Sequence, residues 1–207
     1  MKYKTINTDE EIPEELYIFQ FFENTPIGRI YKESFDRSQK IFSAGISNLE
    51  NPIFKEKFLN GEINYTDILN ENFSCRLTKF GFENINNEFE VVVENYRKNN
   101  FPHYPSRLSC IYAFEDFDTC KLVSQLYKWD LNEVKKFKIV KLHSACKTHM
   151  EIISTYKPDP QLITNLNDCL KKYWMGEKIE EILLNNKRLS VAPIYEYLIE
   201  GVLEEIK

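Results

Sequence analysis

The sequence has few of the residues and runs that mark several large classes of protein. It has no apolar run near the roughly 20 residues that a membrane-spanning helix requires. Its first 15 residues are polar and acidic and lack the apolar core of a signal peptide. Glycine and proline number only 6 and 8, which excludes collagen-like and low-complexity chains. These absences predict a cytoplasmic protein without a membrane partner.

Cysteine and histidine are too sparse and scattered to form a metal or redox motif. The 5 cysteines make no CxxC pair, and the 3 histidines have no zinc-ligand spacing. Glycine-rich phosphate loops, GxSxG and HExxH are also missing. We therefore expect reduced thiols and no metal ion. We expect His143 and His149, beside a strand connection, to be surface or capping residues rather than ligands.

What the chain does contain is the composition of a folded domain. Hydrophobic residues make up 43%, aromatic residues 14% and charged residues 29% of the chain, which supports a buried core without disulfides. The net charge of −5 argues against an extended basic surface for nucleic acid. With no internal repeat and no long linker, the length predicts one domain over residues 1–207, with 32–100 as a candidate helical insert.

Hydrophobic periodicity predicts a mixture of short strands and helices. Strands are expected at 16–22, 28–31, 107–114, 138–142, 150–154 and on both sides of a hinge at Gly201 within 193–206. Helices are expected at 80–99, 119–128, 159–173 and 177–186, the second capped by Asp118 or Thr119. This order of elements predicts an α+β fold with a mixed or antiparallel sheet.

One segment concentrates groups that can bind a ligand. Residues 105–112 carry a guanidinium, two serine hydroxyls and a phenol between a loop and a predicted strand. On a strand, Arg107 and Ser109 share one face, whereas Leu108 and Tyr112 share the other. Two interpretations stay open: either Arg107 and Ser109 are solvated, or Arg107 is a planar fork for a phosphate or carboxylate.

Two later segments combine aromatic residues with an unusual carboxylate. Tyr173 and Trp174 form an aromatic pair before a turn, and Glu196 opens a strand between two tyrosines. If Glu196 is buried, it needs a hydrogen-bonding partner or a shifted pKa. Alternatively, strand alternation turns Glu196 to water while Tyr173 and Trp174 close a helix against the core.

Taken together, these segments resemble the ADP-ribosyltransferase superfamily, in particular bacterial and phage members. The matching features are Pro105-Ser106-Arg107-Leu108-Ser109, Tyr173-Trp174-Met175-Gly176 and Glu196-Tyr-Leu-Ile-Glu-Gly201. The segment 110–116 is similar to the Gly-Ile-Tyr-Phe-Ala-Asp strand of poly(ADP-ribose) polymerases. The resemblance covers 101–207 and, more weakly, 16–31. It implies a split pair of small mixed or antiparallel sheets with flanking helices, and NAD in the cleft between them.

The resemblance also implies roles for individual residues. Glu196 corresponds to the catalytic carboxylate, which stabilises the positive charge on ribose as the nicotinamide bond breaks. Tyr112 matches the middle position of a His-Tyr-Glu arrangement, or else Ser106 or Ser109 is the serine of an Arg-Ser-Glu arrangement. Arg107 is expected to pair with the pyrophosphate.

The other residues that the resemblance assigns to NAD binding are Ser109, Gln20, Tyr173 and Trp174. Gln20 lies on the first predicted strand, where the His-Tyr-Glu branch carries a histidine. A ring of Tyr112, Tyr173 or Trp174 is expected to stack on nicotinamide. No metal is required.

The implied function is transfer of ADP-ribose from NAD to a macromolecular acceptor, either protein or nucleic acid. Such an enzyme acts as a toxin or a factor in phage–host conflict, with a cognate inhibitor or partner protein as a further expectation. Two alternatives stay open. One is an NAD glycohydrolase, with water as the acceptor. The other is a catalytically inactive domain that binds NAD or a partner, which fits a first strand without histidine.

Overall fold

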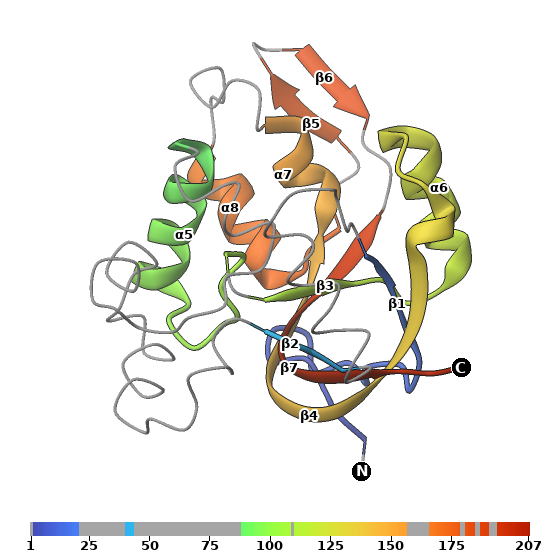
Figure 1. The fold of residues 1–207 in the computed structure, drawn as a ribbon. Helices are drawn as coiled ribbons and strands as arrows, with labels where there is room; N and C mark the ends of the chain where they lie inside the picture. Colours follow the sequence, from blue (N-terminus) through green and yellow to red (C-terminus); the bar gives the residue numbers. More distant parts are fainter. Residues whose placement is uncertain are drawn as a thin grey trace.

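The computed structural model describes residues 2–20, 40–43, 88–108, 110–156, 166–178, 181–184, 187–190 and 194–207. Within these residues the chain forms a curled sheet flanked by helices (Figure 1). The strand pairs that are described are all antiparallel, so the prediction of an α+β fold is confirmed at this level. The predicted strand at 28–31 and most of the candidate insert at 32–100 lie outside the described residues.

The main sheet curls until its first strand reaches the short strand beside the last one. Its strands are β1 (Leu16–Phe19), β2 (Lys40–Phe42), β3 (Ile111–Ala113), β4 (Val134–His149) and β7 (Tyr195–Glu205). Their order is β1-β4-β7-β2, and β3 pairs with the first half of β7. The backbones of Tyr17 and Phe114 exchange hydrogen bonds of 2.9 and 2.7 Å, which joins β1 to the end of β3. A separate hairpin pairs β5 (Glu181–Leu184) with β6 (Lys187–Ser190).

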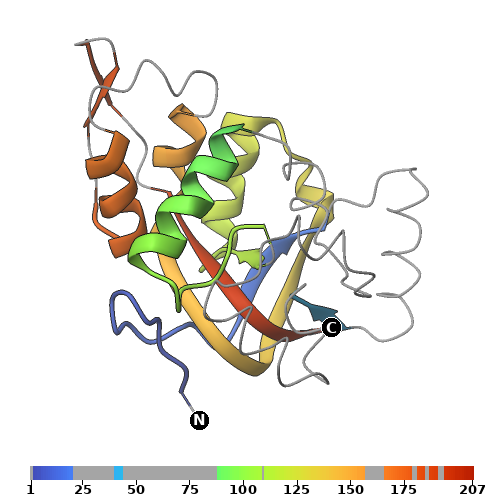
Figure 2. The same cartoon turned by 90° about the vertical axis from the view of Figure 1, so that its left-hand side faces the viewer.

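The helices pack around this sheet. They are α5 (Glu88–Asn100), α6 (Phe117–Tyr127), α7 (Met150–Tyr156) and α8 (Leu166–Met175), with a short 3₁₀ turn η2 (Leu131–Glu133) before β4. α8 contacts α5, α7 and β4, and these three helices are grouped together in Figures 1 and 2. α6 lies on the opposite side of Figure 1 from α5 and contacts α7, because the Tyr127 hydroxyl donates to Glu151 Oε1 and Val123 shares a core with Met150.

Two cores lie on opposite faces of β7. Leu198 belongs to the core between the sheet and the helices, together with Phe89 of α5 and Trp174 of α8. Tyr197 and Ile199 belong to the core inside the curl of the sheet. Because side chains alternate along a strand, residues 196 and 200 share the helix-facing side with Leu198.

β4 is much longer than the strand predicted at 138–142. It continues through the expected polar connection, because residues 144–149 pair one by one with β7, from Ser144 opposite Glu200 to His149 opposite Tyr195. The strand predicted at 150–154 is wrong, since that segment forms α7. His149 is fully buried, with its ring 5.3 Å from that of Tyr195, so the surface prediction for His149 is wrong as well.

β7 is one continuous strand, so the predicted hinge at Gly201 is also wrong. The pairing of β4 with β7 shifts register between Ile139 and Lys141 and again between Leu142 and Ser144. At this irregularity the backbones approach closely, and a Cβ on Gly201 would lie 2.4 Å from the Lys141 carbonyl oxygen. Glycine is therefore required by a close backbone approach rather than by a bend.

Gly201→Ala is expected to lower the free energy of unfolding by about 1–3 kcal/mol, because the added methyl group forces the two strands apart. Urea unfolding followed by circular dichroism measures this change. Val140→Ala is the control, since Val140 is 43% exposed on the neighbouring stretch of β4. That control is expected to change stability by about 0.5 kcal/mol or less. An unchanged urea midpoint for Gly201→Ala would contradict the close approach.

The remaining differences concern helix boundaries. α6 begins at Phe117 and is capped by Asp116, whose carboxylate accepts the Thr119 N–H at 2.6 Å, rather than by Asp118 or Thr119. The helix predicted at 177–186 is wrong, because 181–184 pairs with 187–190 as a hairpin. In this segment strand pairing outweighs the helical spacing of apolar residues. The helices predicted at 80–99 and 159–173 are present as α5 and α8 in their described parts.

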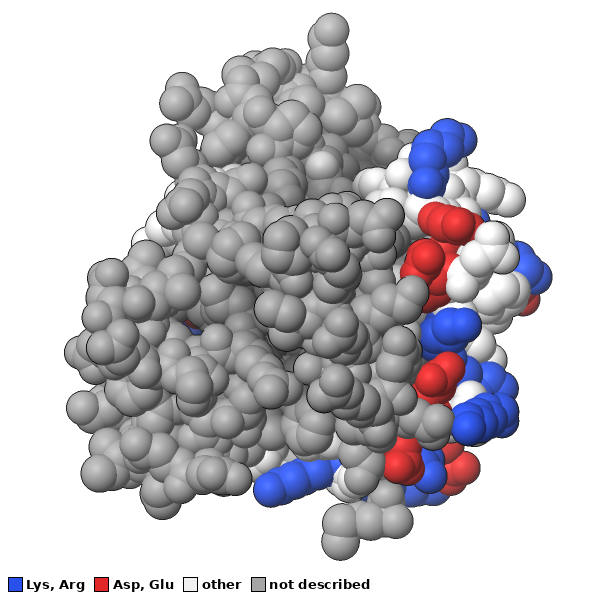
Figure 3. Space-filling view, viewed as in Figure 1, with Lys and Arg blue, Asp and Glu red and all other residues white. Residues whose placement is uncertain are grey.

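The described surface carries mixed charge. Figure 3 shows basic and acidic side chains interspersed over the described part of one face, with no extended area of one sign there. Exposed ion pairs such as Lys121–Asp118, at 2.7 Å, contribute little to stability. No helix among the described residues combines the length and the apolar character needed to cross a bilayer.

Candidate functional site

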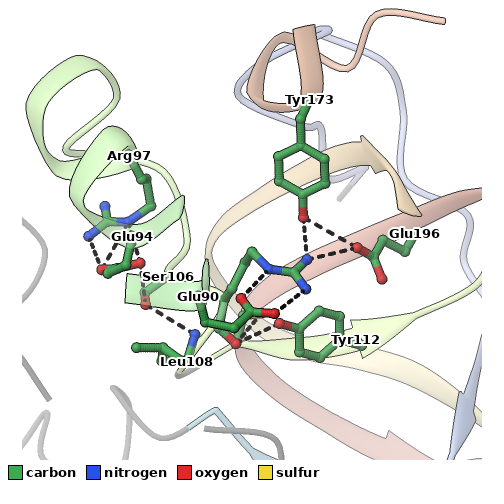
Figure 4. A network of polar contacts seen from close by, with 10 residues as sticks. Glu90, Glu94, Arg97, Ser106, Leu108, Tyr112, Tyr173 and Glu196 are labelled. Carbon is green, nitrogen blue, oxygen red and sulfur yellow. Dashed lines mark hydrogen bonds and ion pairs between the residues drawn. The ribbon is translucent and has the colours of Figure 1, made fainter. Parts of the chain in front are cut away.

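The candidate site is a buried group of charged and phenolic side chains on the helix-facing side of β7 (Figure 4). We call it the Arg107 cluster, and its members are Glu90, Arg107, Tyr112, Tyr173 and Glu196. They come from α5, the chain before β3, β3 itself, α8 and the start of β7. Glu90, Arg107, Tyr173 and Glu196 are between 0 and 5% exposed.

Arg107 joins the cluster by bridging two carboxylates. Its Nε donates to Glu90 Oε2 at 3.0 Å, and its Nη1 donates to Glu196 Oε1 at 3.1 Å. Nη1 also donates to the Tyr173 hydroxyl at 2.5 Å, and that hydroxyl donates to Glu196 Oε1 at 3.3 Å. The guanidinium carbon lies 5.3 and 5.5 Å from the ring centroids of Tyr112 and Tyr173, which adds cation–π attraction.

A turn, not a strand, carries Arg107 into the interior. β3 begins only at Ile111, and before it the Ser106 carbonyl accepts the Cys110 N–H at 2.9 Å. The Ser106 hydroxyl also accepts the Leu108 N–H at 3.2 Å. Such local hydroxyl-to-backbone bonds compete with strand pairing. The prediction of a strand from residue 107, with a solvated Arg107 as one interpretation, is therefore wrong; Ser109 lies outside the described residues.

The environment of the cluster also shifts the pKa values of its members. Burial raises the pKa of Glu196, and the Glu90 carboxylate adds to this, while Arg107 and the Tyr173 hydroxyl lower it. Burial alone would lower the pKa of Arg107, but Glu90, Tyr112, Tyr173 and Glu196 raise it well above its ordinary value. Burial is also the main cause of the strongly raised pKa of Tyr173. At neutral pH the site therefore holds a fixed guanidinium charge and a neutral phenol beside Glu196.

Tyr173→Phe is expected to raise the pKa of Glu196 further, because it removes a hydrogen bond that favours the ionised carboxylate. On acidification, any activity that needs ionised Glu196 is therefore lost at a higher pH in the variant than in the wild type. A carbon-13 NMR titration of the Glu196 carboxyl measures the shift. Tyr104→Phe is the control, since Tyr104 stacks on Phe101 at 4.9 Å instead. A titration midpoint that stays constant or falls in Tyr173→Phe would contradict the assignment.

Three charged residues of α5 were missed by sequence reasoning. Glu90, Glu94 and Arg97 are buried, although the periodicity predicted that Val92 faces inward, and Val92 is 39% exposed. The signal that could have found them is their spacing of four and three residues, which places them on one helical face beside Val93. Charged residues are seldom buried unless they are paired, and the pairing partner of Glu90 lies 17 residues away.

The predicted site residues divide into those that join the cluster and those that do not. Tyr112 joins it, because its hydroxyl donates to the Arg107 carbonyl at 2.7 Å. Trp174 is fully buried in the core, with its ring 5.0 Å from Tyr173. Gln20 is also buried, but the hydrogen bond described for it runs from its backbone N–H to the Glu133 carbonyl. Among the described residues, no hydrogen bond links Gln20 or Trp174 to the cluster.

A second carboxylate lies on the same face of β7. Glu200 is 2% exposed and pairs in register with Ser144 of β4. Burial, and secondly the charge of Glu200, raise the pKa of the Cys110 thiol well above its ordinary value. The helix-facing side of β7 therefore presents carboxylates at both ends of its first half. Among the described residues, no group of three or more His, Cys, Asp or Glu side chains is arranged to hold a metal ion.

The fold and the site define a mixed α/β protein with a curled antiparallel sheet and a buried arginine–glutamate–tyrosine cluster against it. Residues 3–203 match the model of a family described as "Protein of unknown function (DUF2441)". This match spans nearly the whole chain, so the protein belongs to that family. No curated protein matches the chain.

Proposed function

We propose that the protein is an NAD-dependent ADP-ribosyltransferase that modifies a protein or nucleic-acid acceptor. The observation that carries the proposal is the meeting of Arg107, Tyr173 and Glu196 in one buried cluster. Tyr173 and Glu196 lie 66 and 89 residues from Arg107 in the sequence, and all three belong to the segments that resemble this superfamily. Glu196 also lies at the start of a late strand, where the resemblance expects the catalytic carboxylate.

Glu196 is suited to stabilise positive charge on the NAD ribose. Arg107 and Tyr173 both bind its Oε1 atom, and among the described residues no hydrogen bond reaches Oε2 (Figure 4). In the proposed reaction the nicotinamide–ribose bond breaks, and nicotinamide leaves with the bonding electron pair. Oε2 faces the developing charge on the sugar, and the acceptor then bonds to the anomeric carbon and loses its proton. A water-poor site strengthens this stabilisation.

Arg107 has a different proposed role from the pyrophosphate contact that the resemblance implies. Its guanidinium already bridges Glu90 and Glu196, so binding a phosphate would require breaking buried ion pairs. We propose that Arg107 keeps Glu196 ionised and oriented. Since Glu196 is only 4% exposed, the proposal also requires that NAD binding opens a path to Oε2.

The test is incubation of the purified protein with NAD labelled in its adenylate phosphate, together with a bacterial lysate. The expected result is label on a macromolecule, sensitive to either protease or nuclease, with none for Glu196→Gln. Release of nicotinamide without any labelled macromolecule would instead support the glycohydrolase. Binding of NAD with neither product would overturn both activities and leave the inactive binding domain. An associated inhibitor or partner protein stays a prediction.

A further inference from the structure

The loop before Arg107 is held by a second buried polar network on α5. Its members are Glu94, Arg97 and Ser106, which are 8, 3 and 4% exposed. Arg97 Nη2 donates to Glu94 Oε1 at 2.7 Å, and the Ser106 hydroxyl donates to Glu94 Oε2 at 2.9 Å. The Glu94 carboxylate therefore links Arg97 of α5 to Ser106, the residue directly before Arg107. Figure 4 shows this network beside the Arg107 cluster.

Arg97 fixes the loop through its backbone carbonyls. Its Nη1 donates to the carbonyls of Pro102 and Tyr104, each at 2.9 Å. The loop contains prolines at 102 and 105, which have no N–H and limit the hydrogen bonds that the loop can make by itself. A single guanidinium from α5 therefore supplies hydrogen bonds to two carbonyls of this half-buried loop.

The Ser106 hydroxyl also makes a hydrogen bond within the turn that carries Arg107. Because its hydroxyl proton is directed at Glu94, its oxygen lone pairs are left to accept the Leu108 N–H at 3.2 Å. That bond, with the one from Cys110 N–H to the Ser106 carbonyl, closes the turn around Arg107. Both the hydroxyl and the carbonyl of Ser106 therefore take part in the turn that carries Arg107.

Helix α5 contacts both the side chain of Arg107 and the backbone turn that carries it. Glu90 and Glu94 are one helical turn apart on α5, so they share a face. Glu90 binds the Arg107 guanidinium directly, while Glu94 binds the backbone turn through Ser106. A shift of α5 would displace both attachments together.

We propose that Glu94, Arg97 and Ser106 form a positioning clamp that holds Arg107, and through it Glu196, in the geometry required for catalysis. The catalytic part of this inference rests on the proposed function. None of the three residues is expected to touch NAD. The Ser106 hydroxyl is engaged by Glu94 and by the Leu108 N–H, so this proposal gives up Ser106 as the serine of an Arg-Ser-Glu arrangement. Loss of the clamp therefore lowers kcat and leaves KM nearly unchanged.

The test compares Ser106→Ala with Ser124→Ala. Both variants remove a hydroxyl that donates to a buried or half-buried acceptor, but Ser124 lies on α6 and donates to the Trp129 carbonyl at 2.6 Å. Proton NMR measures the solvent exchange of the Arg107 Nε–H group, with the backbone amide of buried Val123 as the reference for global unfolding. Nicotinamide release gives kcat and KM for each variant.

Ser106→Ala is expected to speed exchange at Arg107 Nε–H at least about tenfold relative to Val123. It is expected to lower kcat about tenfold or more. Ser124→Ala is expected to change neither quantity, and Ser106→Thr, which keeps a hydroxyl, is expected to recover both.

Equal exchange at Arg107 in the wild type and Ser106→Ala would overturn the clamp. Faster exchange with an unchanged kcat would overturn its catalytic role. If the wild type itself releases no nicotinamide, the proposed function fails, and the exchange measurement alone decides whether Ser106 positions Arg107.

Discussion

Glu196→Gln is expected to reduce nicotinamide release from NAD by at least about 100- to 1,000-fold, the loss typical of removing one preorganised charge-stabilising group. Glutamine keeps the size of the side chain and an oxygen that accepts from Arg107, but it brings no negative charge to the ribose. The kcat for NAD consumption measures the effect. Glu115→Gln is the matched control, because Glu115 is an exposed carboxylate that pairs with Lys147 at 3.5 Å.

The same substitution is expected to compare more favourably with the wild type in stability as pH rises. Burial raises the folded-state pKa of Glu196 above its unfolded value. Its contribution to stability is therefore present in full below the unfolded pKa and is lost as pH rises through the folded pKa. Glutamine does not titrate, so it avoids that loss. The free energy of unfolding of the variant therefore rises relative to that of the wild type as pH rises. Urea unfolding at several pH values tests this, and a stability difference that turns against the variant as pH rises would contradict it.

Arg107→Met is expected to have the largest effect on stability, with a loss of about 3–5 kcal/mol in the free energy of unfolding at neutral pH. The variant leaves the carboxylates of Glu90 and Glu196 buried without the cation that bridges them. The deficit is expected to shrink at acidic pH, where protonated carboxyl groups no longer need that cation. Urea unfolding measures the change.

Two further variants separate this effect from a general loss of charge. Lys121→Met removes the cation of an exposed pair with Asp118 and is expected to cost about 1 kcal/mol or less. Combining Arg107→Met with Glu90→Gln and Glu196→Gln is expected to recover much of the lost stability, because no buried charge is then left unpaired. A loss below about 1 kcal/mol for Arg107→Met alone would contradict a bridging role in the folded state.

Local sequence patterns were sufficient for elements whose own residues decide their structure. The apolar spacing in α5 and the aromatic and β-branched residues of β1 predicted the right element types. The grouping of Arg107, Tyr112, Tyr173 and Glu196 came from the resemblance rather than from periodicity. The structure brings these four side chains together, whereas their chemical roles remain predictions.

Elements that depend on distant partners could not be predicted in the same way. Residues 143–149 contain His, Ser, Lys and Thr and suggest a polar connection, but pairing with β7 makes them strand. Glu90 and Glu94 would ordinarily face water on a helix, and their burial depends on Arg107 and Ser106, which follow in a separate turn. A one-dimensional pattern does not contain that pairing.

The most direct test of the account is the release of nicotinamide from NAD by the wild type and by Glu196→Gln, measured at equal folded concentrations in the same acceptor-containing lysate. The wild type is expected to release nicotinamide at least about 100 times faster than the variant, above the background of the lysate. Equal rates for the two proteins would show that the Glu196 carboxylate does not act on the nicotinamide–ribose bond.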